Sequence, residues 1–149
     1  MLDTGDPAPD FYLPAAADPD AEYMLSAAAG ASPVVLAFVP DNPADAGSLL
    51  DDLADFEWAA LADRISVFGI GRSQAALVSL AEGLPFPLLV DPEGYVTDLY
   101  GVADRESGPG PHRALVLADQ RCTIRFAWQA STPAADPPLE DLQAAIRSL

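Results

Sequence analysis

The chain contains one cysteine, Cys122, and one histidine, His112, among its 149 residues. A single cysteine excludes an internal disulfide, a redox pair of cysteines within the chain and a metal site built from several thiolates. A single histidine among scattered carboxylates also lacks the ligand spacing of a zinc site. We therefore expect neither a bound metal nor a cofactor.

Lysine is absent, and all seven basic residues are arginine. The chain has 23 aspartate and glutamate residues, so its formal net charge is -16. Nucleic acids and anionic membranes are bound through Lys and Arg, so this charge argues against both as partners. Such charge also strains a compact fold unless salt screens it. The composition resembles that of haloarchaeal proteins adapted to molar salt; an ordinary acidic protein from a GC-rich genome is the alternative.

Long hydrophobic runs are missing as well. The longest strand-like run spans residues 34–39, whereas a membrane-spanning helix needs about 20 apolar residues. Residues 1–6, MLDTGD, lack the basic and then apolar segments of a signal peptide. Pro/Ala/Asp-rich stretches at 14–21 and 132–138 are too short to link domains. We expect one domain over residues 1–149, soluble and cytoplasmic, with a core drawn from the 50% of hydrophobic residues.

Strand-like and helical patterns alternate along the chain. Residues 34–39, VVLAFV, are typical of a buried central strand. Apolar residues recur at helical spacing over residues 44–63, with Asp51, Asp52 and Asp55 on the opposite face. The other expected elements are strands at 65–70, 88–90, 113–118 and 123–129, helices at 73–82 and 139–149, and a helical turn at 97–100. This order predicts an α/β protein with the thioredoxin fold, a central mixed β-sheet with helices on both faces.

Four short segments match one family pattern in order and spacing. They are GDPAPDF at 5–11, FGIGRS at 68–73, LPFPLLVDPEG continuing to LYGV within 84–102, and RALVLAD at 113–119. Together they resemble the motifs G-x-x-A-P-D-F, G-I-S-x-D-S, L-P-F-P-L-L-S-D-P-x-G…Y-G-V and R-x-x-F-V-I-D of the AhpC/TSA peroxiredoxins, with the aspartate of the second motif missing. The resemblance is closest to the short bacterioferritin-comigratory type.

One segment departs from that resemblance. In the family, P-x-x-x-T/S-x-x-C follows the first central strand: the cysteine thiolate attacks peroxide, the hydroxyl bonds to it, the proline shields it, and a distant arginine holds thiolate and peroxide. Residues 40–47 here read PDNPADAG. Pro40 and Arg113 fall on the family positions, but Ala44 replaces the hydroxyl and Gly47 replaces the nucleophile. We therefore predict a degenerate peroxide pocket with no catalytic residue and, with it, no thiol peroxidase activity.

The remaining candidate residues have less support. Cys122 aligns with a glycine of the family's hairpin turn, away from the pocket, so we expect it to be inert. His112, beside Arg113, is expected to face the other side of the strand, and no nucleophile is patterned with it. The aspartate stripe at 51–55 is expected to be a solvated face, with a divalent-cation site as the alternative. Trp58 is a candidate for an intersubunit contact, or a partly buried surface residue.

Three functions stay open. The first is a peroxiredoxin-like binding or interaction module with a degenerate site, associating as a homodimer or with an active relative. The second is an antioxidant oxidoreductase of the AhpC/TSA family that reduces peroxide with an external thiol or an unusual group. The third is a carrier for a small anion bound near Arg113, in a pocket enlarged by the lost Cys and Thr side chains; otherwise Arg113 is a relic paired with an acidic neighbour.

Overall fold

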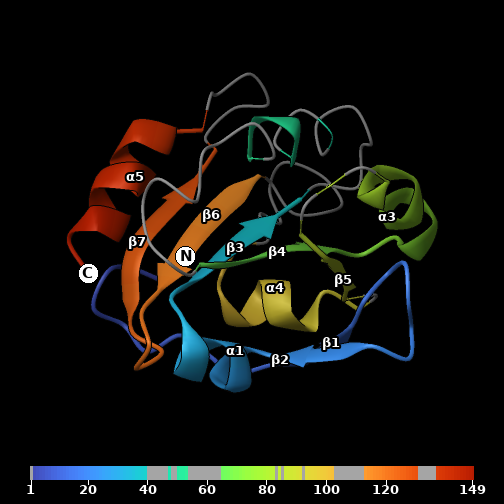
Figure 1. The fold of residues 1–149 in the computed structure, drawn as a ribbon, viewed down its shortest axis with the longest axis horizontal. Helices are drawn as coiled ribbons and strands as arrows, with labels where there is room; N and C mark the ends of the chain where they lie inside the picture. Colours follow the sequence, from blue (N-terminus) through green and yellow to red (C-terminus); the bar gives the residue numbers. More distant parts are fainter. Residues whose placement is uncertain are drawn as a thin grey trace.

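The computed structural model describes residues 2–39, 47, 50–53, 65–82, 84, 86–91, 93–102, 113–130 and 137–149. Its centre is a five-stranded sheet of order β5-β4-β3-β6-β7 (Figure 1). The middle strand β3, Val34–Phe38, is buried along its whole length, which explains why its sequence is continuously apolar. The predicted central strand is therefore confirmed.

The sheet is mixed, as predicted. Strand β3 runs parallel to β4, Ser66–Gly71, and β4 runs parallel to β5, Leu88–Val90. On its other side β3 pairs antiparallel with β6, Ala114–Ala118, and β6 pairs antiparallel with β7, Ile124–Gln129. Parallel neighbours need crossover connections and antiparallel neighbours can share a tight turn, so this is the sheet that the expected order of elements requires.

Helices cover both faces of the sheet, which confirms the predicted fold class. One core cluster lies between the sheet and α1, Leu25–Ala31, together with α4, Tyr95–Leu99. The other cluster lies beneath α3, Gln74–Ala81, and α5, Leu139–Arg147. Figure 1 shows α3 and α5 at opposite ends of the sheet. Side chains at alternate positions of β3 belong to the two different clusters, because successive side chains of a strand point to opposite faces.

The N-terminal part is more ordered than its sequence indicates. Strands β1, Tyr12–Pro14, and β2, Glu22–Met24, pair antiparallel, and α1 follows directly. The Asp10 carboxylate accepts hydrogen bonds from the amide and the hydroxyl of Ser26, both at 2.9 Å, in the first turn of α1. Three-residue strands carry no readable periodicity, so a Pro/Ala/Asp-rich stretch concealed a hairpin.

Two helices differ from their predicted bounds. Helix α4 begins at Tyr95 rather than at the expected residue 97. The Asp91 carboxylate accepts hydrogen bonds from the Tyr95, Val96 and Thr97 amides and so starts the helix two residues earlier. Helix α5 ends at Arg147, so Leu149 lies beyond it and is 49% exposed instead of packing with Leu142 on the apolar side.

Candidate functional site

Two of the four residues predicted for the peroxide pocket, Gly47 and Arg113, lie in the described part of the chain. Pro40 and Ala44 lie outside the described residues, as do His112 and Trp58. Of the predicted aspartate stripe, Asp51 and Asp52 are exposed helical residues, which agrees with a solvated face, and Asp55 falls outside.

Gly47 is a helical residue that lies against α3. It is half-buried, and the helical residues Leu50 and Leu53 are buried in the α3/α5-side core. Among the described residues, a Cβ atom built on Gly47 would meet Cδ2 of Leu80 in α3, at an ordinary contact distance of 3.5 Å. Its φ lies outside the positive range that disfavours side chains. The backbone therefore does not require glycine here, and the described neighbours leave room for a Cβ.

Gly69 differs from Gly47 in this respect. A Cβ on Gly69 in β4 would come within 3.3 Å of Leu50 Cδ2 and would overlap Leu88. Leu50 thus approaches the sheet closely over β4, and glycine at position 69 makes the approach feasible.

Arg113 lies at the same edge of the sheet as the end of β3. It directly precedes β6, and the register pairs Ala114 with Phe38 at the end of β3. The Arg113 carbonyl accepts a hydrogen bond from the Ala130 amide at 2.8 Å, and the residue is only 6% exposed. Alternation along β6 places Arg113 on the side of Leu115 and Leu117, in the core cluster that contains Leu50.

Gly47, whose Cβ would meet Leu80 of α3, and Arg113 are therefore on one face of the sheet, and Arg113 lies at the edge where β3 ends. Arg72, which follows β4 at this edge, lies on the other face: its Nε would be 3.7 Å from a Cβ on Gly94, in the turn before α4. In the described residues, the two positions predicted for the peroxide pocket thus lie on one face of the sheet, with a glycine at position 47 and a buried arginine at position 113.

Cys122 lies in the β6–β7 turn, where the sequence predicted it. Its φ is +57°, its amide donates to the Asp119 carbonyl, and its own carbonyl accepts from the Ala8 amide at 2.7 Å. Burial raises the pKa of the Cys122 thiol, and the nearby carboxylates of Asp10 and Asp119 raise it further. A thiol with a raised pKa is protonated at neutral pH and is a poor nucleophile.

The turn at Cys122 yields a stability prediction. A residue other than glycine in left-handed conformation costs roughly 1–2 kcal/mol, so Cys122→Gly should be more stable than Cys122→Ala by about 1 kcal/mol. Both variants lose the sulfur, and only the glycine variant relieves the backbone. Urea denaturation of the two variants measures the difference, and an alanine variant equal to or more stable than the glycine variant would contradict it.

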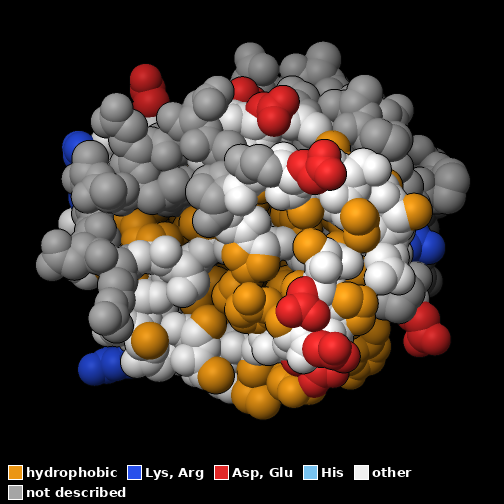
Figure 2. Space-filling view, turned by 45° about the vertical axis from the view of Figure 1, so that its right-hand side comes forward, with side chains coloured by type: hydrophobic (Ala, Val, Ile, Leu, Met, Phe, Trp, Pro, Cys, Tyr) orange, Lys and Arg blue, Asp and Glu red, His pale blue; other side chains and the backbone are white. Residues whose placement is uncertain are grey.

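Neither a metal centre nor a membrane span is found in the part of the chain that the structure describes. No group of three or more His, Cys, Asp or Glu residues there could hold a metal ion. No helix there is long and apolar enough to cross a bilayer. The surface is not uniformly acidic: on the face in Figure 2, apolar side chains gather in the lower half, with carboxylates around them. Tyr12 and Met24, opposite each other in the β1–β2 pair, are 59% and 39% exposed.

The chain is similar to several solved structures. The peroxidoxin BcpB of Mycobacterium tuberculosis is 24% identical, with a TM-score of 0.77 over 100% of this chain and 99% of that chain. The reduced 2-Cys peroxiredoxin of Plasmodium vivax is 22% identical, with a TM-score of 0.80 over 98% of this chain and 81% of that one. M. tuberculosis AhpC is 18% identical, with a TM-score of 0.74 over 99% and 93%.

These likenesses show the thioredoxin fold of the peroxiredoxins. No curated protein matches the chain. The family model described as the AhpC/TSA family matches residues 4–127, which is most of the chain and includes both Gly47 and Arg113. The chain belongs to the AhpC/TSA family.

Proposed function

We propose that this AhpC/TSA family protein has a degenerate peroxide site, lacks thiol peroxidase activity and acts as a binding or interaction module. The observation that carries the proposal is Gly47: it occupies the nucleophile position of the family motif, on a helical stretch that shares a face with Arg113. Peroxide reduction by this family pattern needs a thiolate that attacks the O–O bond, and glycine supplies no such group.

Cys122 does not replace the missing nucleophile. Arg113 precedes β6 and Cys122 lies in the turn after it, so the length of the strand separates them, about 20 Å at about 3.3 Å per residue. The raised pKa of the Cys122 thiol also keeps it protonated. As the chain's only cysteine, it fits a reducing compartment such as the cytoplasm, where we place the protein.

Arg113 supports a second candidate function, the carriage of a small anion. A guanidinium stays charged at all physiological pH values, and this residue is 94% buried, on the face that carries Gly47. Loss of the cysteine and threonine side chains leaves more room for a ligand there. An oxyanion held by Arg113 would be bound without being reduced, which agrees with a module that has lost the chemistry of its family.

Self-association is part of the proposal. Exposed Tyr12 and Met24 lie opposite each other on the outer face of the β1–β2 ribbon, beside exposed Glu22, and such exposed apolar side chains favour contact with a second copy or with an active relative. Light scattering should give about twice the monomer mass of 15.6 kDa; a monomer at all concentrations, and no complex with an active AhpC/TSA protein, would contradict this part.

The activity proposal predicts that the unmodified protein consumes hydrogen peroxide no faster than the buffer with a dithiol reductant. The assay is run in molar KCl to screen the charge of -16, with an active peroxiredoxin as positive control and Cys122→Ser as the matched variant. Turnover that survives Cys122→Ser would establish unusual chemistry or an external thiol. Turnover that disappears in Cys122→Ser would make Cys122 the nucleophile. Either result overturns the proposal.

A further inference from the structure

A cavity of about 580 Å³ lies at the other end of the sheet from Arg113. Its walls come from segments that are distant in sequence: Pro33 just before β3, Asp119 and Arg121 in the β6–β7 turn, Arg125 in β7, and Ala145 near the end of α5. The volume is in the range of small-molecule sites. This cavity plays no part in the proposed peroxide pocket.

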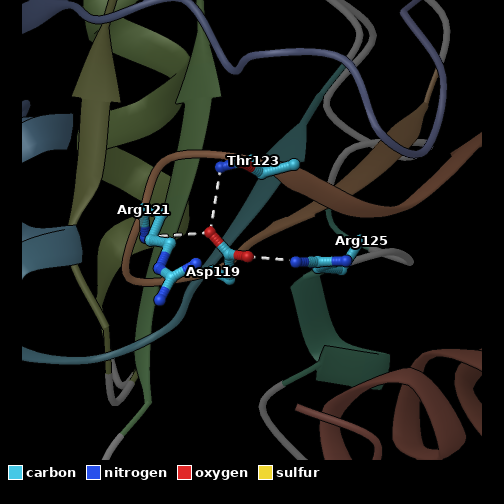
Figure 3. A network of polar contacts seen from close by, with 4 residues as sticks. All are labelled: Asp119, Arg121, Thr123 and Arg125. Atoms are coloured by element: carbon cyan, nitrogen blue, oxygen red, sulfur yellow. Dashed lines mark hydrogen bonds and ion pairs between the residues drawn. The ribbon is translucent and has the colours of Figure 1, made fainter.

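The carboxylate of Asp119 organises the polar wall of the cavity (Figure 3). It accepts hydrogen bonds from the Arg121 amide at 2.8 Å, from the Thr123 amide at 3.0 Å and from Nε of Arg125 at 2.8 Å. Partial burial alone would raise the pKa of Asp119, but the bonds from Thr123, Arg125 and Arg121 outweigh it and hold the pKa below its usual value. Asp119 is therefore ionised and holds Arg125 in place through Nε.

The two arginines bond to this carboxylate in different ways, Arg121 through its backbone amide and Arg125 through Nε. Figure 3 shows the side chains of Arg121 and Arg125 on two sides of Asp119. Nε of Arg125 donates to Asp119, and the two Nη groups of Arg125 are directed away from that bond. Within the described residues, no carboxylate pairs with the guanidinium of Arg121. The Arg121 guanidinium, which lines the cavity, is therefore not neutralised by Asp119.

We propose that this cavity binds a small organic phosphate, with the phosphate group on Arg121 and Arg125. Two guanidinium groups offer more donors than one carboxylate ligand can use, and they match the several oxygens and double charge of a phosphomonoester. Thr4 adds a hydroxyl to the same cavity, while Pro33 and Ala145 provide an apolar wall for the organic part. The last turn of α5 presents its carbonyl end, which repels anions, so the phosphate lies on the arginine side.

Isothermal titration calorimetry with phenyl phosphate tests the proposal on the whole protein. Inorganic phosphate and phenol test the two halves of the probe, and benzoate tests a carboxylate on the same ring. We expect phenyl phosphate to bind more tightly than each of the other three. The affinity should fall as KCl rises from about 0.1 M to 1 M, because salt screens the charges.

Arg121→Gln is the decisive variant, since the Arg121 bond to Asp119 comes from the backbone amide, which the substitution keeps. It should weaken phenyl phosphate binding about tenfold, the cost of about 1.4 kcal/mol for a charged hydrogen bond. Arg147→Gln removes the same charge from α5 outside the cavity wall and should change the affinity less than twofold. No binding, an equal loss in both variants, or phenol or benzoate binding as tightly as phenyl phosphate would each overturn the site. Circular dichroism confirms that both variants are folded.

Discussion

Replacing Gly47 by cysteine together with Ala44 by threonine is expected to raise peroxide consumption at least about 100-fold above that of the unmodified protein. The gain reflects a restored nucleophile, for which positioned groups contribute on the order of 10² to 10⁴ in rate. The structure is compatible with a side chain at position 47: among the described residues, a Cβ there meets Leu80 Cδ2 at 3.5 Å, on a backbone without positive φ. Peroxide turnover with a dithiol reductant, compared with the unmodified protein, measures the gain.

Arg113 is expected to make the restored thiol reactive. It is buried on the face that carries the helical stretch of Gly47, so its positive charge favours the thiolate there. Gly47→Cys alone should gain less than the double variant, because it lacks the hydroxyl that bonds to the sulfur. Adding Arg113→Gln to the double variant should remove most of the gain. Gly47→Ser has nearly the same volume and no thiol, and it should stay inactive.

The control for this experiment is the reactivity of the new thiol itself. If the double variant folds, its cysteine at position 47 reacts with a thiol reagent, and peroxide turnover still stays at background, then the pocket is not a relic of a peroxidase. Gly47→Ala gives an independent check of the local structure. A helical glycine costs up to about 1 kcal/mol relative to alanine, so this variant should be more stable than the unmodified protein.

The predictable elements are those with continuous or periodic apolar sequence. Strands β3 and β6 were identified because both of their faces are covered, which requires an unbroken apolar run. Leu50 and Leu53 follow helical spacing and are buried as expected. The β1–β2 pair and α1 were missed because the contact that starts α1 joins Asp10 to Ser26, 16 residues away. A hydrogen bond between such distant residues leaves no local pattern.

The two candidate sites also differ in how far the sequence predicts them. Gly47 and Arg113 could be named from sequence because each lies in a short motif with fixed spacing. The cavity at the other end of the sheet could not, because Pro33, Arg121, Arg125 and Ala145 come from separate segments that only the fold brings together. Cys122 is an intermediate case. Its alignment with a family glycine predicts the turn, but only the backbone geometry shows that Cys122 adopts the left-handed conformation.

Asp91→Ala is expected to lower the free energy of unfolding by about 3 kcal/mol, more than any other substitution proposed for this protein. The carboxylate is 2% exposed and accepts the Tyr95, Val96 and Thr97 amides at 3.1, 3.0 and 3.2 Å. Its removal leaves these donors without an acceptor at the start of α4, and each buried unsatisfied donor costs roughly 1–3 kcal/mol. Part of this cost is recovered as the helix start shifts or takes up water.

The loss extends into the core because α4 carries Val96 and leads into Tyr100. Both side chains are buried, and the Tyr100 hydroxyl donates to the Pro9 carbonyl at 2.7 Å, which ties α4 to the N-terminal segment. A displaced helix start therefore disturbs a contact between residues 91 positions apart. At about 2–4 °C per kcal/mol for a domain of this size, the Tm should fall by about 10 °C.

Charge is the confounding variable, since any lost carboxylate relieves repulsion in a chain of net charge -16. Asp98→Ala is the matched control: it removes a carboxylate from α4 itself, the helix that Asp91 caps, at an exposed position. It should be neutral or slightly stabilising. Asp91→Asn keeps one acceptor oxygen and should lose about half as much as Asp91→Ala. Guanidinium denaturation in molar KCl ranks the three, and an Asp91→Ala variant as stable as Asp98→Ala would show that α4 begins without its carboxylate cap.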